Sequence, residues 1–286
     1  MLFLQLLADG LISGMAVGVV AISFSLVYAT TRVFHVAHAG LYTLGGYIAW
    51  YATERGLALG LACVLAMAGA AAVGGLIQQQ LYARLERSKA SPLVMLIASL
   101  GALAILQNLI AIAFTPNILS FSNSWRLETF AIGPVTLSYA QIVLAIACLI
   151  AFFWLLWFTQ TTRHGRRIRA VASNPLLAEI TRLRPATVSI QVMMIASGLV
   201  AIPGVLVGLD QAMQPYTGTL VLLTATIAMI AGGIGSLTGA FIVSIVLSVL
   251  QTLSLAVMSG RWAIAATFGL FIVFILIKPE GLFRKR

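Results

Sequence analysis

Long apolar stretches are the feature that most constrains how this chain can fold. A helix needs about 20 apolar residues to cross the hydrocarbon core of a bilayer, and most of the stretches reach that length. Proline and charge seldom interrupt them, which favours helices over the alternating pattern of a membrane β-barrel. We therefore predict an all-α integral membrane protein, a polytopic helical bundle of about eight or nine transmembrane segments. The stretches are residues 3–30, 34–53, 57–78, 93–114, 138–158, 188–209, 219–231, 237–257 and 262–277.

The composition agrees with a membrane protein. Of the 286 residues, 61% are hydrophobic and 8% are charged, whereas a soluble domain carries about 25% charged residues. No polar stretch is long enough for a separate soluble domain, so we expect residues 1–286 to form a single transmembrane domain. The two cysteines, Cys63 and Cys148, lie in apolar stretches and predict neither a disulfide framework nor a metal site. The N-terminal residues lack a basic region, and we expect them to start the first span.

Two of the apolar stretches are irregular. Residues 34–53 contain two histidines and three glycines, which predicts a broken or re-entrant helix. Residues 219–231 are short for a span, and a glycine-rich break follows over 231–240. We therefore expect these two segments to differ from simple transmembrane helices.

The basic residues predict the orientation. Most of the 17 lysines and arginines lie in the loops 79–90 and 159–187 and in the C-terminal tail 278–286. If the spans alternate as predicted, these segments share one side, which the positive-inside rule assigns to the cytoplasm, together with the C-terminus. The N-terminus lies outside if 34–53 crosses fully and inside if it is re-entrant. Because the charge sits at helix ends, the net charge of +10 does not indicate nucleic acid binding.

One loop is more basic than orientation requires. The segment RHGRRIRAVASNPLLAEITRLR, residues 163–184, holds six arginines. Asn174 before Pro175 is a helix-start signal, with an Asn or Ser side chain as the cap. We predict a basic helix over about 165–172, a turn, and a second short helix over about 175–183. Such helices need a surface to pack on, either anionic lipid headgroups or a cytoplasmic protein partner.

Several stretches, taken together and in order, resemble the permease subunits of branched-chain amino acid ABC importers. They are residues 9–51, 91–110, 165–180, 230–251 and 277–286. The resemblance implies that 159–187 is a cytoplasmic coupling loop, which docks on a separate ATPase subunit and transmits its closure to the membrane helices. The residues that match this coupling element, or that would supply its apolar contact, are Gly165, Arg166, Arg169, Ala170, Asn174, Pro175, Leu176, Leu177 and Glu179.

The same resemblance implies the partners. They would be a second permease of the same class, two ATP-binding cassette subunits and an extracytoplasmic solute-binding protein, in a bacterial-type inner membrane. The chain contains no GxxxxGKS/T phosphate loop, so a partner would bind the ATP and this chain would need no cofactor. The solute would be a branched-chain amino acid or a related small polar compound, such as an amide or urea.

Four polar residues inside the apolar stretches are candidates for the substrate pathway: His38, Tyr42, Gln107 and Asn108. Ionisable residues within the membrane are rare and mark functional sites. His38 follows closely after Arg32, however, and an interfacial histidine bonded to the backbone fits the pattern equally well. Neighbours on a helix point about 100° apart, so at most one of Gln107 and Asn108 is expected to face a pathway. The other would bond an adjacent helix.

Two sets of glycines predict close helix packing or a turn. Gly10, Gly14 and Gly18 recur every four residues and leave one face of a helix flat, so that another helix can approach. A second set predicts either a plain turn between helices or an unwound backbone at the pathway. This set is Gly232, Gly233, Gly235 and Gly239.

Two other classes of function fit the sequence less well. An ion- or proton-coupled secondary transporter needs carboxylates inside the membrane, and only Asp9 among the acidic residues lies in an apolar stretch. An intramembrane enzyme needs a nucleophile with its base, or metal ligands, within the spans. We find no Ser/His/Asp or His/carboxylate set at usable spacing. We therefore expect a transporter, neither an enzyme nor a metal-binding protein.

Overall fold

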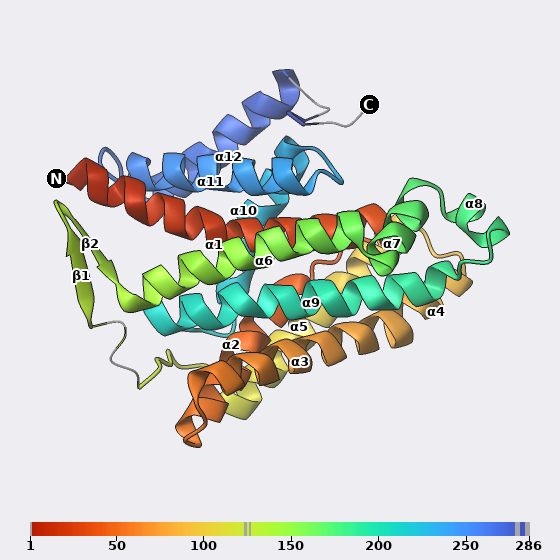
Figure 1. Cartoon of the computed structure of the whole chain (residues 1–286), viewed down its shortest axis with the longest axis horizontal. Coiled ribbons are helices and arrows are strands. Elements are labelled where there is room, and N and C mark those ends of the chain that lie inside the picture. Colours follow the sequence, from red (N-terminus) through yellow and green to blue (C-terminus); the bar gives the residue numbers. More distant parts are fainter. Residues whose placement is uncertain (1, 123–124, 126, 278–280, 284–286) are drawn as a thin grey trace.

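The computed structural model describes residues 2–122, 125, 127–277 and 281–283, and these form a bundle of helices (Figure 1). The first half of the chain contains α1 (Leu2–Thr31), α2 (His38–Glu54), α3 (Leu59–Ile77), the π-helix η1 (Gln78–Tyr82), α4 (Ala83–Arg87) and α5 (Pro92–Phe114). The second half contains β1 (Thr129–Ile132), β2 (Val135–Ser138), α6 (Tyr139–Thr161), α7 (Arg163–Ser173), α8 (Pro175–Ile180), α9 (Pro185–Asp210), α10 (Thr217–Gly232), α11 (Leu237–Ser254) and α12 (Gly260–Ile277).

The helices follow the predicted apolar stretches, and the chain is an all-α membrane protein as expected. By length and hydropathy, the candidate membrane spans among the described residues are six: α1, Leu59–Arg87, α5, α6, α9 and α11. Helix α10 is apolar but has only 16 residues, about 24 Å of helix against a hydrocarbon core of about 30 Å. The total of eight or nine spans stays a prediction.

Side-chain hydrogen bonds at the start of each helix explain several boundaries. Ser138 and Gln141 form a capping box at the start of α6, in which two otherwise unpaired N–H groups find acceptors. Ser91 caps α5, where Pro92 occupies the first turn, and Ser236 caps α11. Proline is favoured in the first turn because its missing N–H would be unpaired there in any case.

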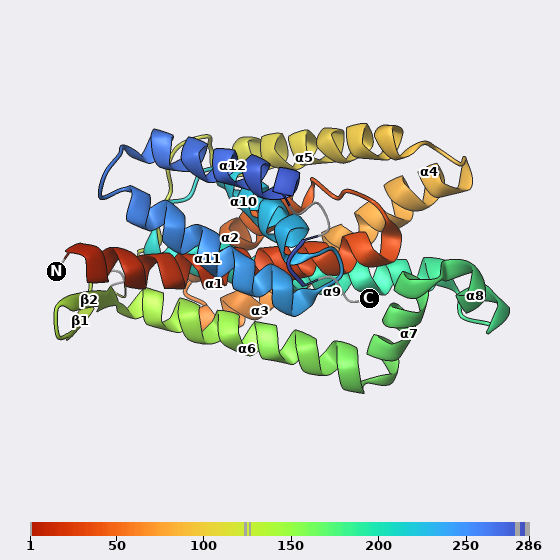
Figure 2. The same cartoon turned by 90° about the horizontal axis from the view of Figure 1, so that it is seen from above.

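One end of the bundle carries a β-hairpin that the all-α prediction did not include. Strands β1 and β2 pair antiparallel, with Thr129 opposite Ser138, and Gly133 makes the turn at φ +61°. Gln5 of α1 binds the hairpin, since its Oε1 accepts a hydrogen bond from Thr136 N at 2.9 Å. The N-terminus of α1 therefore lies beside the hairpin (Figure 2). We call this end the hairpin end.

The opposite end is formed by α7 and α8, which project beyond the long helices (Figures 1 and 2). The C-terminal end of α1 reaches it, because Arg32 Nη2 donates to Ala172 O at 3.4 Å. We call it the basic end, after the arginines of residues 163–184. The predicted basic tail, Lys278, Arg284, Lys285 and Arg286, lies outside the described residues.

The second apolar segment is broken. Residues 32–37 contain no helix, and α2 begins at His38. Helix α2 then runs to the hairpin end, where Trp50 Nε1 donates to Ser120 O at 3.1 Å. Because α1 runs towards the basic end and α2 returns, the N-terminus and the arginine-rich helices lie at opposite ends. The crossing of the membrane by this segment stays a prediction.

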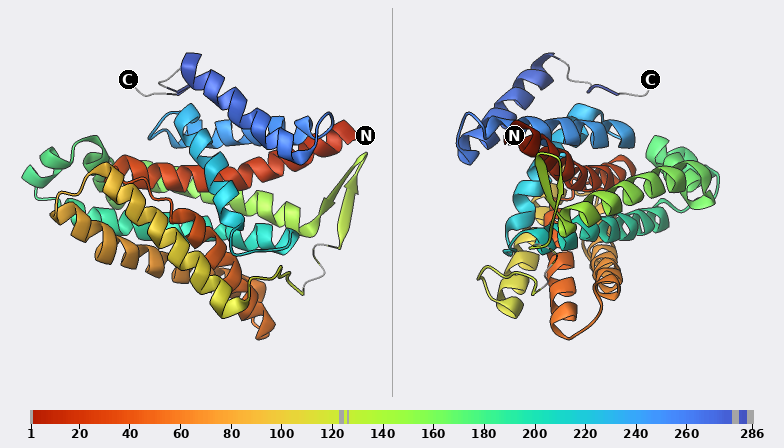
Figure 3. Two further views of the ribbon diagram at one scale, coloured as in Figure 1. Left: turned by 180° about the vertical axis from the view of Figure 1, so that it is seen from behind. Right: turned by 60° about the vertical axis from the view of Figure 1, so that its left-hand side comes forward.

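Burial separates central from peripheral helices. The share of buried residues in the most apolar window is 78% for both α1 and α9, against 22% for α5 and 33% for α6. Helices α1 and α9 therefore form the centre, while α5 and α6 present apolar side chains outward, as helices in contact with lipid do. Helix α10 crosses this bundle steeply inclined to α1, and α12 lies outermost beside α11 (Figure 3).

Candidate functional site

The arginine-rich segment forms two short helices, as the sequence predicts. Helix α7 (Arg163–Ser173) is slightly longer than expected, and α8 (Pro175–Ile180) is shorter than the predicted 175–183. Helix α8 ends early because Arg182 adopts a positive φ of +61°, a conformation that a continuing helix does not contain. The two helices stand at the basic end as an α7–α8 unit.

Asn174 joins the two helices. Its Oδ1 accepts hydrogen bonds from the N–H groups of Leu176 and Leu177, both at 3.1 Å. Pro175 occupies the first turn of α8. Asn174 is also the C-cap residue of α7, directly after Ser173. The same residue therefore ends α7 and caps the start of α8, which holds α8 at a fixed direction from α7.

Helix α7 is amphipathic. Ile168 and Val171 are buried, whereas Arg166, Arg169 and Ala170 are exposed. Gly165 is buried against the end of α6, where a Cβ would collide with Phe158 O and with Thr159. Glycine is thus required for α7 to turn tightly from α6, and the arginines are left facing outward.

Helix α8 presents apolar side chains outward. Leu176 is 69% exposed, Leu177 58% and Ile180 73%, while Glu179 is exposed beside them and Ala178 is buried. Helix α8 lies beyond the long helices (Figure 2), and no described residue covers this patch. Exposed apolar side chains gathered on one short element mark an interaction surface.

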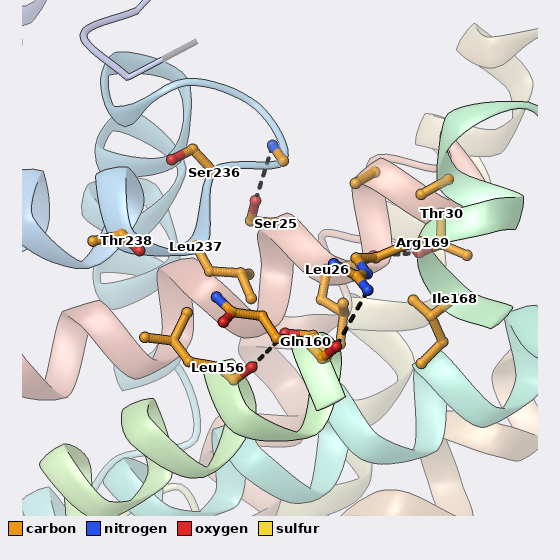
Figure 4. Close-up of a pocket in the computed structure, with 14 residues that line it drawn as sticks. Ser25, Leu26, Thr30, Leu156, Gln160, Ile168, Arg169, Ser236, Leu237 and Thr238 are labelled. Atoms are coloured by element: carbon orange, nitrogen blue, oxygen red, sulfur yellow. Dashed lines mark hydrogen bonds between the residues drawn. The ribbon is translucent and has the colours of Figure 1, made fainter. Parts of the chain in front are cut away.

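A small cavity of 140 Å³ separates α7 from the turn between α10 and α11 (Figure 4). Arg169 lines it from α7 and donates to Gln160 O at 3.3 Å. Ser25 lines it from α1, and its Oγ accepts from Gly235 N of the turn at 3.2 Å. The α7–α8 unit thus meets α1, α6 and the turn at one place.

The predicted glycine turn is present between α10 and α11. Gly233 and Gly235 have φ of +98° and +86°, which L side chains rarely adopt. Gly232 and Gly239 lie back to back, so that a Cβ on either would collide with the other's backbone. Leu282 N donates to Ala231 O at 2.8 Å, so described residues of the C-terminal segment lie against the same turn.

The glycines of α1 pack on α11. A Cβ would lie 2.8 Å from Val249 Cα at Gly10, 2.6 Å from Ile245 Cα at Gly14, and 2.5 Å from Phe241 Cδ2 at Gly18. Real Cβ contacts are longer than this, so the close approach of the two helices depends on all three glycines.

His38 is fully buried in the bundle. Its Nε2 is 2.9 Å from Ser23 Oγ of α1. The neighbouring His35, also fully buried, has its Nδ1 2.8 Å from Tyr82 Oη, which donates to Ser99 Oγ of α5 at 2.8 Å. These bonds tie His35 of the non-helical segment to η1 and α5, and His38 at the start of α2 to α1, as buried polar groups require.

Of the other three pathway candidates, Tyr42 lies on α2, whereas Gln107 and Asn108 are adjacent residues of α5 that point in different directions. Tyr42 of α2 is 3% exposed, and its hydroxyl has no hydrogen-bond partner among the described residues. Gln107 is buried and donates to Thr219 Oγ1 of α10 at 2.9 Å. Asn108 is exposed on the outer face of α5 and donates to Ala104 O of its own helix at 2.8 Å. Gln107 therefore bonds an adjacent helix, and the pathway role of all four residues stays a prediction.

Sequence reasoning missed Tyr82, Ser99 and Ser25. One signal in the sequence could have indicated η1. It is the polar run QQQ, which precedes Leu81 and Tyr82 at the end of an apolar stretch. The π-helix, a form often found at functional positions, turns Tyr82 into the core. Among the described residues, no three His, Cys, Asp or Glu side chains gather as metal ligands do.

Apolar helices of membrane length with buried polar links between them define a multi-pass membrane protein. Over residues 6–277 the chain matches the family described as the permease component of branched-chain amino acid transport systems, and it belongs to that family. The recognition made from the sequence is thereby confirmed, and the chain is a multi-pass permease, one component of a transport system.

Curated relatives match over nearly the whole chain. The high-affinity branched-chain amino acid transport system permease protein LivH of Salmonella typhimurium is 27% identical, over 98% of this chain and 95% of the relative. The corresponding protein BraD of Pseudomonas aeruginosa gives the same three values. A probable LivH of Methanocaldococcus jannaschii is 24% identical over 82% of this chain and 75% of its own.

One solved structure shares the fold. PsaBC from Streptococcus pneumoniae, in complex with a Fab, superimposes with a TM-score of 0.53 and 16% identity, covering 97% of this chain and 92% of that one. At this identity the likeness concerns the arrangement of helices alone.

Proposed function

We propose that this chain is the transmembrane permease subunit of an ATP-driven ABC importer for branched-chain amino acids or related small polar solutes, such as amides or urea. The α7–α8 unit is the coupling element that docks on a cytoplasmic ATPase subunit. The basic end faces the cytoplasm, with the C-terminus, and the hairpin end with the N-terminus faces outside. The membrane is a bacterial-type inner membrane.

The single observation that carries this proposal is the uncovered apolar patch of Leu176, Leu177 and Ile180 on α8. A lipid-facing amphipathic segment places its apolar side against the bilayer and its basic side towards headgroups. Helix α8 instead projects beyond the long helices (Figure 1). The apolar patch of α8, flanked by the arginines of α7, fits a groove on a protein partner. The arginines would contact the rim of that groove and set the position of α8 in it.

The structure suggests how movement at α8 reaches the spans. Ile168 and Val171 anchor α7 in the bundle, so a displacement of α8 is passed to the ends of α1 and α6. The cavity between Arg169 and the α10–α11 turn leaves α7 room to move against that turn (Figure 4). Alternating access then follows from a rearrangement of α10 and α11 relative to α1.

The partners complete the importer. Two ATP-binding cassette subunits bind the nucleotide, so this chain needs no cofactor of its own. A second permease of the same class forms the pair, and membrane lipid surrounds it. An extracytoplasmic solute-binding protein delivers the solute at the hairpin end, where the outer loop between α9 and α10 contains the exposed Tyr216.

Co-purification from the native host tests this proposal. We expect an ATPase subunit to purify with the natural chain and to be lost from the variant in which Leu176 and Leu177 are both changed to Asp. Leu127→Asp is the control, because Leu127 is 77% exposed beside the hairpin. A chain that purifies alone and moves solute into liposomes without ATP would contradict the proposal and favour a secondary transporter.

A further inference from the structure

A second and larger cavity, of 630 Å³, lies towards the hairpin end. Six helices line it: α1, α2, α6, α9, α10 and α11, with the start of α12. The lining residues of α1 all belong to the N-terminal part of that helix, from Leu6 to Val17. Its volume falls within the range of about 300–1,000 Å³ that small-molecule sites occupy.

Two carboxylates, Asp9 of α1 and Asp210 at the end of α9, line this cavity. Asp9 is the acidic residue within the apolar stretch of α1. A carboxylate inside a span is energetically unfavourable, and such residues mark functional sites. The described residues that line the cavity include no Lys, Arg or His. The described lining residues therefore give the cavity a negative character.

The start of α6 links the two carboxylates. Gln141 Nε2 is 3.5 Å from Asp9 Oδ1, and Ser138 Oγ donates to Asp210 Oδ1 at 2.8 Å. Ser138 and Gln141 are bonded to each other as the capping box of α6. The two aspartates are thus both bonded to the first residues of α6 and line one cavity.

Each carboxylate keeps capacity for a further donor. No described residue donates a hydrogen bond to Asp210 Oδ2, and the bonds from Gln5 Nε2 to both oxygens of Asp9 are long, at 3.3 Å. A carboxylate oxygen has two lone pairs and forms its strongest hydrogen bonds with charged donors.

An unpartnered hydroxyl points independently to a ligand. Tyr42 of α2 lines the same cavity and is only 3% exposed. Its Oη has no hydrogen-bond partner among the described residues. A buried hydroxyl without a partner costs about 1–3 kcal/mol. Tyr42 Oη is covered in this structure, so a ligand would relieve this cost once the side chain turns towards the cavity. Apolar side chains complete the walls: Ile12, Leu144, Val207, Leu220, Val221 and Ile264.

We propose that this cavity binds the ammonium end of a small aliphatic solute. Asp9 and Asp210 accept N–H hydrogen bonds from the ammonium group, Tyr42 bonds to it or to the adjacent polar atom, and the apolar walls contact the hydrocarbon part. Because no basic side chain among the described lining residues would pair with a carboxylate, that end of an amino acid points away from the aspartates. The proposal rests on the importer function above and names the chemical group that the site recognises.

Equilibrium binding to the intact transport complex in nanodiscs, without the binding protein, tests this. The probes share one hydrocarbon skeleton: 3-methylbutylammonium, L-leucine and 4-methylpentanoate. We expect the amine and leucine to bind and to compete with each other, and the acid, which lacks the ammonium group, to bind neither alone nor as a competitor. Binding of 4-methylpentanoate equal to that of the amine would overturn the proposal.

Substitutions assign the binding to these residues. Asp9→Asn and Asp210→Asn keep the acceptor oxygens used by Gln141 and Ser138 but remove the charge, so we expect each to weaken amine binding about tenfold or more. Tyr42→Phe should weaken it by a smaller factor. Glu54→Gln is the control, because Glu54 is exposed at the hairpin end and bonded to Ser122 outside the cavity.

ATP hydrolysis by the same preparations separates the two proposals. A complex that hydrolyses ATP normally but binds the amine equally with Asp9→Asn or Asp210→Asn overturns the ammonium site alone. A chain that recruits no ATPase contradicts the importer function instead. Saturable Na⁺ binding that is lost in both variants, with no amine binding, would overturn the ammonium site in favour of an ion-coupling site.

Discussion

Gly14 of α1 lies against the backbone of Ile245 of α11, so that a Cβ at Gly14 would stand 2.6 Å from Ile245 Cα. Ser244 Oγ reinforces the contact by donating to Gly14 O at 3.1 Å. Two helices distant in the sequence are thereby held at a separation that only glycine permits. Helix α11 leads back to the glycine turn, so this contact also positions the turn beside α7.

Replacing this glycine should loosen the bundle. Gly14→Leu places a side chain where the backbone of α11 lies, and we expect a loss of stability of about 1–3 kcal/mol from overpacking. Thermal unfolding in a mild detergent measures it. Gly101→Ala is the control, since a Cβ at Gly101 meets nothing within 4 Å in the middle of α5. Equal melting temperatures for both variants would contradict the role of the α1–α11 contact.

Removing the hydroxyl of Tyr82 should destabilise the region around residues 32–37. Tyr82→Phe leaves His35 Nδ1 and Ser99 Oγ without their shared partner in a fully buried place, and we expect a cost of about 1–3 kcal/mol. Tyr51→Phe, which removes only an exposed bond to Arg55, should change stability by less than about 0.5 kcal/mol. Protease susceptibility near His35, compared between the two variants, gives a local readout; equal susceptibility would argue against the network.

The cap at Asn174 should matter for coupling more than for the fold. Asn174→Ala removes the acceptor for Leu176 N and Leu177 N, at a cost of about 1 kcal/mol to α8. We expect ATP-driven uptake to fall several-fold while the yield of folded protein is unchanged. Asn174→Asp keeps the acceptor and should restore uptake, and failure of that rescue would show that the cap is not what coupling requires.

The backbone of the glycine turn offers a sharper comparison. Gly235 at φ +86° and Gly56 at φ +82° share the same conformation, and an added Cβ meets at most Ala29 Cβ at 3.8 Å. Alanine at either position should cost about 1–2 kcal/mol through the backbone alone. Only Gly235→Ala should lower ATP-driven uptake, because Gly56 lies in the loop between α2 and α3. Similar uptake by the two variants would separate the turn from coupling.

Much of the fold was predictable because it depends on local patterns. The apolar stretches predict the helices, since backbone groups in a membrane must be paired within the segment. Asn174 and Pro175 predict the start of α8 because a cap acts within one turn. The break before α2 is visible in the glycines and histidines, but its consequence, a non-helical stretch tied to Tyr82 and Ser99, is not.

The candidate sites were predictable only in part. The six arginines and the glycine turn are local signals, and both appear at the expected positions. His38, which a surface location would fit as well as a buried one, proves fully buried, because only the surrounding helices determine which face of α2 is covered. Nothing in the sequence predicts that Asp9 and Asp210 line one cavity.

The sequence by itself determined that this chain is a multi-pass membrane protein, roughly where its long helices lie, and which loop gathers positive charge. These properties arise from hydropathy, from caps and from charge along a continuous segment. Tertiary structure alone decided that α2 returns to the hairpin end, that α1 is central, and that the capping box of α6 lies between two aspartates. Such relationships depend on which helix packs on which, and that choice is made by contacts between residues distant in the chain.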